Sequence, residues 1–211
     1  MFSRIVFIGP QGSGKGTQAA KLSAILSVPH ISTGELFRAA IQHKTSTGVE
    51  VESLLAKGEL VPDTMTNAVV AEAFTERHLQ EGYILDGYPR TVAQAEYLDT
   101  LGNPDAVIVL ALSDDDAVKR ISGRRMCVKC KQMYHTEFAA ARVDGVCDTC
   151  GGALQHRDDD HEDAVRERLR LYHQETEPIV AFYESKGLVK RVDGRPSIDE
   201  VHSAIRQQLN V

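Results

Sequence analysis

The sequence predicts an α/β fold in which a central parallel sheet of about five strands carries helices on both faces. Three observations lead to this prediction. Five short apolar runs are typical of buried strands, helical patterns alternate with them, and the first run enters a helix through a glycine-rich turn. Alternating strands and helices form right-handed crossovers, and ligands bind such sheets at the carboxyl ends of the strands. We therefore expect the functional residues at that edge of the sheet.

The expected strands are the hydrophobic runs at residues 5–8, 28–31, 83–87, 106–112 and 188–192. Apolar side chains at helical spacing predict helices over residues 18–26, 36–43, 48–57, 64–80, 91–101, 114–122, 161–174 and 178–186, and from residue 198 onward. We expect a break in the helical pattern between residues 174 and 178. From residue 124 to about residue 160 the periodicity disappears, and cysteines, glycines and charged residues dominate.

Three serines are expected to begin helices. Ser32 and Ser197 are each followed three residues later by a glutamate, which is the spacing of a capping box. Ser113 precedes three aspartates, and the helix dipole favours negative charge in a first turn.

Composition excludes several classes of protein. The formal net charge is −6 and no run is rich in lysine and arginine, which argues against a nucleic-acid groove. No apolar run approaches the roughly 18 residues that cross a bilayer. The N-terminus enters the first strand without a signal-peptide layout. We expect a cytoplasmic protein that binds neither membrane nor nucleic acid, and a monomer, since no exposed apolar stripe calls for a dimer.

Residues 9–17 form the first candidate site. They follow a buried strand and open a helix, which is the context that a phosphate-binding glycine loop requires. Glycines let successive N–H groups point at one anion, and the helix N-terminus adds partial positive charge. Lys15 can reach the outer phosphates, and Ser13 or Thr17 can offer a hydroxyl to Mg²⁺ or to a phosphate oxygen. Gly16 stands where the usual pattern has that hydroxyl. The alternative is a glycine-rich turn that binds nothing.

Asp86 ends a hydrophobic strand, where nucleotide-binding proteins place the acid that holds Mg²⁺ or its waters. Its alternative role is to cap the next turn. Arginines at the ends of elements or on the irregular segment suit phosphoryl transfer, because a guanidinium group neutralises phosphate oxygens well. Each of them alone could instead form a surface salt bridge. These arginines are Arg38, Arg90, Arg124, Arg157 and Arg168.

Four cysteines have the spacing of a structural zinc site. They are Cys127, Cys130, Cys147 and Cys150, two CxxC pairs separated by 16 residues. Four thiolates close a tetrahedral site and leave no open position for catalysis. Two disulfides or a redox CxxC are the alternatives, and both are uncommon in a cytosolic chain. We expect zinc to order a segment that is too polar to build a core of its own.

Taken together, these residues resemble adenylate kinase of the bacterial type with a long zinc-binding lid. The resemblance covers essentially the whole chain. It rests on the glycine loop at residues 9–18, on the segment 31–38, and on Asp-Gly-Tyr-Pro-Arg-Thr at 86–91 with Gln94. It also rests on Gly-Arg-Arg at 123–125, Arg-Asp-Asp at 157–159 and Arg-Glu-Arg at 166–168. The resemblance implies a nucleoside-monophosphate-kinase architecture with an inserted zinc-ribbon-like lid.

The resemblance also implies an activity, the reversible transfer of the terminal phosphoryl group of Mg·ATP to AMP, which gives two ADP. The implied catalytic residues are Lys15, Asp86, Arg90, Arg124, Arg157 and Arg168. The residues implied to bind ATP are Gly12, Ser13, Gly14, Lys15, Gly16, Thr17, Arg120, Arg124, Met133, Tyr134 and the chain near Arg195. Those implied to bind AMP are Thr33, Arg38, Glu59, Leu60, Val61, Gly87, Tyr88, Pro89, Arg90, Gln94, Arg157 and Arg168.

Three parts of the chain are expected to form separate units. The core comprises residues 1–31, 62–122 and 161–211, the flap segment is 32–61, and the lid segment is 123–160. Closure of the lid would keep water from accepting the phosphoryl group. The nearest alternative function is a UMP/CMP-type kinase. More distant alternatives are a nucleotide-gated nucleic-acid binder and a nucleotide switch without turnover.

Overall fold

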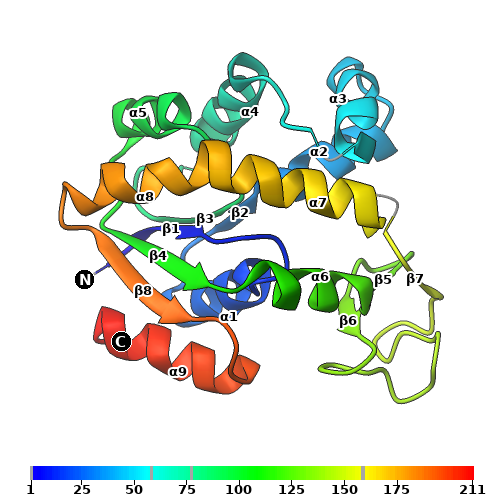
Figure 1. Ribbon diagram of the computed structural model, residues 1–211. Coiled ribbons are helices and arrows are strands. Elements are labelled where there is room, and N and C mark those ends of the chain that lie inside the picture. The colour runs from blue at the N-terminus through cyan, green and yellow to red at the C-terminus, as the bar shows by residue number, and fades with distance from the viewer. Residues whose placement is uncertain (1, 58, 77, 158–159) are drawn as a thin grey trace.

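The computed structural model describes residues 2–57, 59–76, 78–157 and 160–211. Its centre is a five-stranded sheet in the order β2-β3-β1-β4-β8, and every neighbouring pair is parallel (Figure 1). The strands are β1 Arg4–Ile8, β2 His30–Ser32, β3 Tyr83–Asp86, β4 Ala106–Ala111 and β8 Val189–Asp193. All five expected strands are therefore confirmed. Asp158 and Asp159 of the predicted lid motif lie outside the described residues.

The helices follow the predicted pattern with shifted ends. They are α1 Lys15–Leu26, α2 Thr33–Gln42, α3 Ser46–Lys57, α4 Asp63–Glu76, α5 Val92–Leu101, α6 Asp114–Ser122, α7 Glu162–Leu171, α8 Glu177–Glu184 and α9 Ile198–Leu209. The expected break after residue 174 is wrong, because a π-helix, Tyr172–Thr176, joins α7 to α8. Pro178 lies in the first turn of α8, where a missing N–H group costs little.

Two of the three expected serine caps are present. Ser197 and Glu200 form a complete capping box, and the Ser113 hydroxyl accepts the Asp116 N–H at 3.2 Å. Ser32 does precede α2 as its N-cap residue, but the predicted capping box is wrong, since its side chain makes no capping hydrogen bond. Ser32 is still the last residue of β2 and pairs with Asp86, so sheet pairing fixes its backbone.

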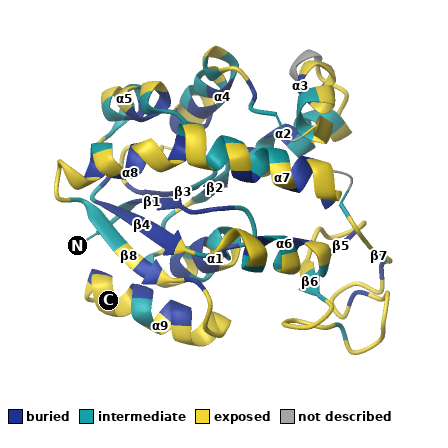
Figure 2. Ribbon diagram, viewed as in Figure 1, coloured by how far each residue is buried: buried dark blue, intermediate teal, exposed yellow. Residues whose placement is uncertain are grey.

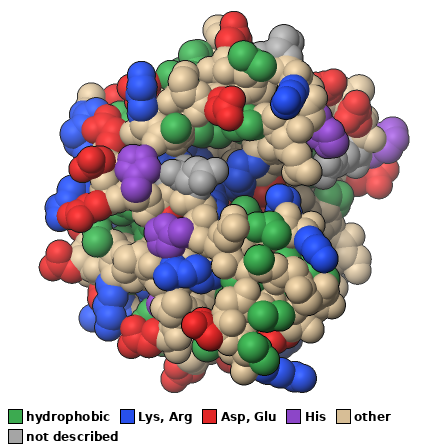
Figure 3. All heavy atoms as spheres, turned by 90° about the vertical axis from the view of Figure 1, so that its right-hand side faces the viewer, with side chains coloured by type: hydrophobic (Ala, Val, Ile, Leu, Met, Phe, Trp, Pro, Cys, Tyr) green, Lys and Arg blue, Asp and Glu red, His purple; other side chains and the backbone are tan. Residues whose placement is uncertain are grey.

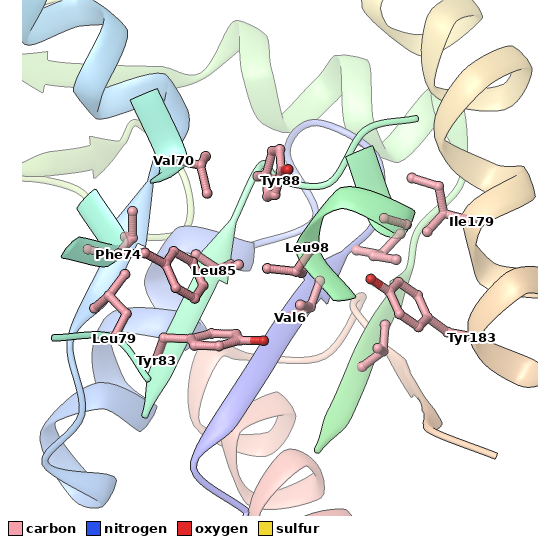
Figure 4. Packing of buried hydrophobic residues seen from close by; sticks show 14 of the residues in the cluster. Val6, Val70, Phe74, Leu79, Tyr83, Leu85, Tyr88, Leu98, Ile179 and Tyr183 are labelled. Atoms are coloured by element: carbon pink, nitrogen blue, oxygen red, sulfur yellow. The ribbon is translucent and has the colours of Figure 1, made fainter. Parts of the chain in front are cut away.

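The period of two along the strands divides the core between the two faces of the sheet. Val6 and Ile8 of β1 pack with α4, α5 and α8, whereas Ile5 and Phe7 pack with α1 and α9. Figure 2 shows the buried sheet between these helix layers, and Figure 4 shows the first cluster from close by. Each such side chain contributes roughly 1.5–3 kcal/mol when fully buried. The sheet is therefore a rigid base for the loops at its carboxyl edge.

The lid segment carries its own small antiparallel sheet in the order β6-β5-β7. Its strands are β5 Arg124–Cys127, β6 Met133–His135 and β7 Leu154–Gln155. They lie at the lower right in Figure 1, beyond α6. Among the described residues, no helix combines the length and the apolar character that crossing a bilayer requires.

Helices α1 and α9 are joined by a buried histidine. His202 is 9% exposed, and its Nδ1 lies 3.1 Å from Gln18 Oε1. The Gln18 amide nitrogen donates to the Ile198 carbonyl at 2.8 Å, so its oxygen faces His202, which therefore donates. Burial lowers the pKa of His202. Lys21 and Arg206 add to this lowering and Asp199 opposes it.

The His202 pKa predicts an acid-side loss of stability. The unfolded state takes up this proton below a pH of about 6.5, whereas the folded state resists it, so stability falls as the pH drops through that range. The free energy of unfolding, measured with urea at pH 8.0 and at pH 5.5, should fall less between these two values for His202→Gln than for the wild type. The hydrogen bonds of Glu177 and Asp114 to the His173 ring raise the pKa of His173. His173 therefore adds to the free energy of unfolding as the pH falls, which is the opposite effect to that of His202. His173→Gln should therefore show a larger loss. Equal losses in all three proteins would contradict both assignments.

Candidate active site

The glycine loop connects the end of β1 to the start of α1. Gly14 is the N-terminal cap of α1 with a φ of 94°, a left-handed backbone conformation that favours glycine. A Cβ atom on Gly16 would lie only 3.2 Å from Asp86 Oδ2. The glycine at this position therefore lets the carboxylate at the end of β3 approach the loop. The free amides of α1 and the Asp86 carboxylate thus border one space.

Lys15 is folded back onto the loop. Its Nζ donates to the carbonyl oxygens of Gly9 and Pro10, both at 2.8 Å. Burial lowers the pKa of Lys15 to about 8, with Asp86 opposing and Arg90 and Arg124 contributing. Three cationic groups therefore face one small region, a combination that favours a polyanionic ligand.

A second part of the site lies across β3 from the loop. Strands β2 and β3 end side by side, with Ser32 opposite Asp86. Next to them, the Thr33 hydroxyl and Arg90 Nε both donate to the Gly87 carbonyl at 2.8 Å. The cavity there has a volume of about 20 Å³, and it is lined by Thr33, Gly34, Phe37, Leu55, Leu60, Val61, Thr66, Gly87, Arg90 and Gln94.

This lining brings together six residues that were predicted to bind the monophosphate: Thr33, Leu60, Val61, Gly87, Arg90 and Gln94. Gly34, Phe37, Leu55 and Thr66 were not predicted. The apolar faces of the helices at 36–43 and 48–57 were the only sequence signal for Phe37 and Leu55. Tyr88 and Pro89 are buried, and the Tyr88 hydroxyl donates to Asn67 Oδ1 at 2.7 Å. The Tyr88 hydroxyl is thus engaged away from the cavity.

The remaining residues predicted for this side do not line the cavity. A Cβ on Gly34 would lie 3.1 Å from Arg38 Nη1, so the Arg38 guanidinium covers the first turn of α2. Glu59 and Arg157 are half-buried.

Arg124 is held by a buried carboxylate. Its Nε donates to Asp160 Oδ2 at 2.7 Å, and a second nitrogen bonds the other oxygen. The Asp160 side chain is fully buried, and Gln11 Nε2 of the glycine loop donates to it at 3.3 Å. A buried pair of this kind is costly to break, because one charge would be left without compensation. It connects the glycine loop to the start and the end of the lid segment.

Two side chains of α7, one from its N-terminal cap and one from its last turn, bind the C-terminal end of α3. Arg168 Nη2 donates to the Leu55 carbonyl at 3.3 Å, and His161 Nε2 lies 2.9 Å from the Ala56 carbonyl. His161 Nδ1 accepts the Ala164 N–H, so Nε2 carries the proton. These bonds satisfy carbonyl groups that a helix end leaves without partners. The flap segment and the chain that follows the lid segment are therefore directly connected.

The face that lies at the right of Figure 1 is hollowed between two lobes, and Lys and Arg side chains are visible inside the hollow (Figure 3).

Comparison with known proteins identifies the family. The family model described as adenylate kinase matches residues 7–188. The chain belongs to the adenylate kinase family. It is similar to the adenylate kinases of Streptomyces coelicolor (46% identity over 204 residues, 94% of each chain) and Thermodesulfovibrio yellowstonii (44% over 207 residues, 96% of each). It is also similar to that of Lachnospira eligens, with 42% identity over 207 residues, which are 96% of this chain and 97% of the relative.

In this adenylate kinase family member, two of the residues predicted on the ATP side meet. Arg120 donates to the carbonyl oxygens of Gly194 and Arg195 at 2.8 and 2.9 Å. Its guanidinium also lies over the Phe138 ring, 5.6 Å from the centroid. Two further predicted residues lie on β6. Met133 is exposed there, and the Tyr134 hydroxyl accepts the Asp148 N–H and lies 3.4 Å from Cys147 Sγ.

The four cysteines of this adenylate kinase family member converge as predicted. Their Sγ atoms all lie within 4.8 Å of one another, and Cys127–Cys150 and Cys130–Cys147 are each separated by 3.5 Å. These separations are much longer than a disulfide bond of about 2.05 Å. They are near the roughly 3.8 Å edge of a tetrahedron with 2.3 Å metal–sulfur bonds. The set of donors fits a thiolate-bound metal ion.

Proposed function

We propose that this chain catalyses the reversible transfer of the terminal phosphoryl group of ATP to AMP, with ATP at the glycine loop and AMP in the cavity across β3. The observation that carries this proposal is the position of Asp86 between the two regions. Asp86 touches the glycine loop at Gly16, and the next residue, Gly87, borders the cavity. Two phosphate chains bound in these regions would meet end to end.

The protein's part in this reaction is to position the two nucleotides and to neutralise the charge of their phosphate groups. An oxygen of the AMP phosphate attacks the terminal phosphorus of ATP, and the bond from that phosphorus to the bridging oxygen breaks, which gives two ADP. The attacking group is already an anion, so no general base is required. Lys15, Arg90 and Arg124 supply positive charge that neutralises the negative charge on the phosphate oxygens.

Two metal ions are part of this proposal. Mg²⁺ would enter with ATP and neutralise phosphate charge, and the Asp86 carboxylate beside Gly16 fits the task of holding the ion or its waters. Zn²⁺ would bind the four cysteine thiolates, because this donor set suits zinc.

The cavity across β3 requires opening before a nucleotide can bind. Its volume of about 20 Å³ has room for about one water molecule, whereas pockets for small ligands measure ~300 Å³ or more. Its lining residues Phe37, Leu55 and Leu60 lie in the flap segment. We propose that this segment and the lid segment move relative to the core.

A side-by-side assay tests the proposed substrate. The enzyme would be incubated with Mg·ATP and AMP, CMP, UMP or GMP, and formation of the two diphosphates would be followed. We expect kcat/KM for AMP to exceed that for each other nucleotide at least tenfold. A preference for UMP or CMP would favour the alternative function, a UMP/CMP-type kinase. Absence of turnover with all four nucleotides would favour a nucleotide switch without turnover.

Three further statements stay predictions: a monomer, a cytoplasmic location and no binding to nucleic acid. The net charge of −6 supports the last of these. Light scattering would test the first, and salt-dependent retention on DNA or RNA would contradict the last.

A further inference from the structure

Gln94 is fixed by two groups of opposite hydrogen-bonding character. It is 2% exposed and lines the cavity in which we place AMP. Its Oε1 accepts the Arg90 backbone N–H at 2.7 Å, and its Nε2 donates to Asp63 Oδ1 at 2.6 Å. A backbone N–H only donates and an ionised carboxylate only accepts. The side-chain amide therefore has a single orientation that satisfies both neighbours.

Asp63 is itself held in place. It is the first residue of α4, and its second carboxylate oxygen accepts the Thr91 hydroxyl at 2.8 Å. Thr91 caps α5 by accepting the Gln94 N–H at 3.1 Å. Two helix starts that lie 28 residues apart in the sequence are thus joined through one carboxylate. Asp63 does not line the cavity, so it acts through Gln94.

The remaining hydrogen-bonding groups of the Gln94 amide can distinguish one purine base from another. An amide has two donor hydrogens and two acceptor lone pairs, and Asp63 and Arg90 leave one of each. Adenine presents an N6 amino donor next to the N1 acceptor, which matches a free oxygen and a free N–H in this order. Hypoxanthine presents the O6 acceptor next to an N1–H donor, which matches only the flipped amide.

We propose that Asp63 is a positioning residue that sets the purine specificity of the acceptor site by fixing the orientation of the Gln94 amide. This inference rests on the proposed function, since it takes the AMP base to face Gln94. Without the carboxylate, the Arg90 N–H is the one remaining partner of the Gln94 side chain among the described residues, and a base with the reversed pattern can compensate for its loss. Burial of the amide makes the constraint strong, because a buried donor without a partner is costly.

AMP and IMP are the probes that test this inference, because they differ only at this edge of the base. The measured quantity is the ratio of kcat/KM for AMP to that for IMP, with Mg·ATP saturating. We expect the ratio to fall at least tenfold in Asp63→Ala and in Asp63→Ser, which keeps a polar group at the start of α4. KM for ATP should change less than threefold. In Asp63→Asn the ratio should remain within threefold of wild type, because the Asn oxygen can accept from Gln94 and its NH₂ can face Thr91.

Asp199→Ala is the matched control. Asp199 also lies in a first helix turn and also has a partner, Lys21, at 2.8 Å, but it is part of α9. We expect it to leave the ratio unchanged. The inference is overturned if Asp63→Ser keeps the ratio within twofold of wild type, or if Asp63→Asn loses as much as Asp63→Ser. A wild type that does not prefer AMP would instead refute the proposed function, so the two failures are distinguishable.

Discussion

Lys15→Met is expected to lower kcat about 10²- to 10³-fold, the order of loss seen when one preorganised donor to a developing charge is removed. Lys15 is the cation that begins α1, and the carbonyl groups of Gly9 and Pro10 hold it in the loop. Methionine keeps the length of the side chain but has no charge and no donor. The measurement is steady-state formation of ADP from ATP and AMP, with thermal unfolding as a check of the fold.

Lys21→Met is the matched control for this loss. Lys21 lies on the same helix and pairs with Asp199 on the surface. We expect normal turnover, because exposed ion pairs contribute little. Normal turnover of Lys15→Met would refute the assigned role of Lys15, whereas a large loss in both variants would indicate damage to α1.

Cys147→Ser should lower the melting temperature of the protein more than it alters the rate constant of the chemical step. The four thiols lie within 4.8 Å of one another, and the described part of the lid segment contributes only Cys127 and Cys147 to the buried apolar residues. A bound ion would therefore be the main stabilising contact of this segment, and its loss is a loss of folding free energy. Calorimetry with metal quantification and single-turnover kinetics would measure both effects.

Val143→Ala serves as the control in the same segment, since the Val143 side chain is 62% exposed and cannot bind a metal ion. It should retain the metal and the wild-type melting temperature. Complete metal release from Cys147→Ser with an unchanged melting profile would show that the ion has no structural role.

The sequence predicted the sheet and the glycine loop well, because both depend on local patterns. Five apolar runs became five parallel strands, and Gly-rich residues between a strand and a helix became the loop. Helix ends were less accurate. The break expected after residue 174 is a π-helix, because packing on the core outweighed the local signal.

The site was predicted only as far as its residues lie in recognisable motifs. Asp63 and Asp160 were missed as partners of Gln94 and Arg124, which lie 31 and 36 residues away along the chain. Both carboxylates act through tertiary contacts, and each occurs among charged residues that would also suit the surface. Only the fold reveals that Asp160 is buried against Arg124 and that the half-buried Asp63 bonds Gln94.

The junction of α7 with α8 couples parts of the molecule that lie far apart. The two helices and the π-helix form one continuous helical rod of roughly 35 Å at about 1.5 Å per residue (Figure 1). His161 and Arg168 hold the end of α3 near one end of this rod. At the end of the π-helix the Thr176 hydroxyl donates to the Arg90 carbonyl at 2.9 Å. If α3 moves when AMP binds as proposed, these hydrogen bonds would carry part of that movement to the Arg90 backbone, whose N–H group also bonds Gln94.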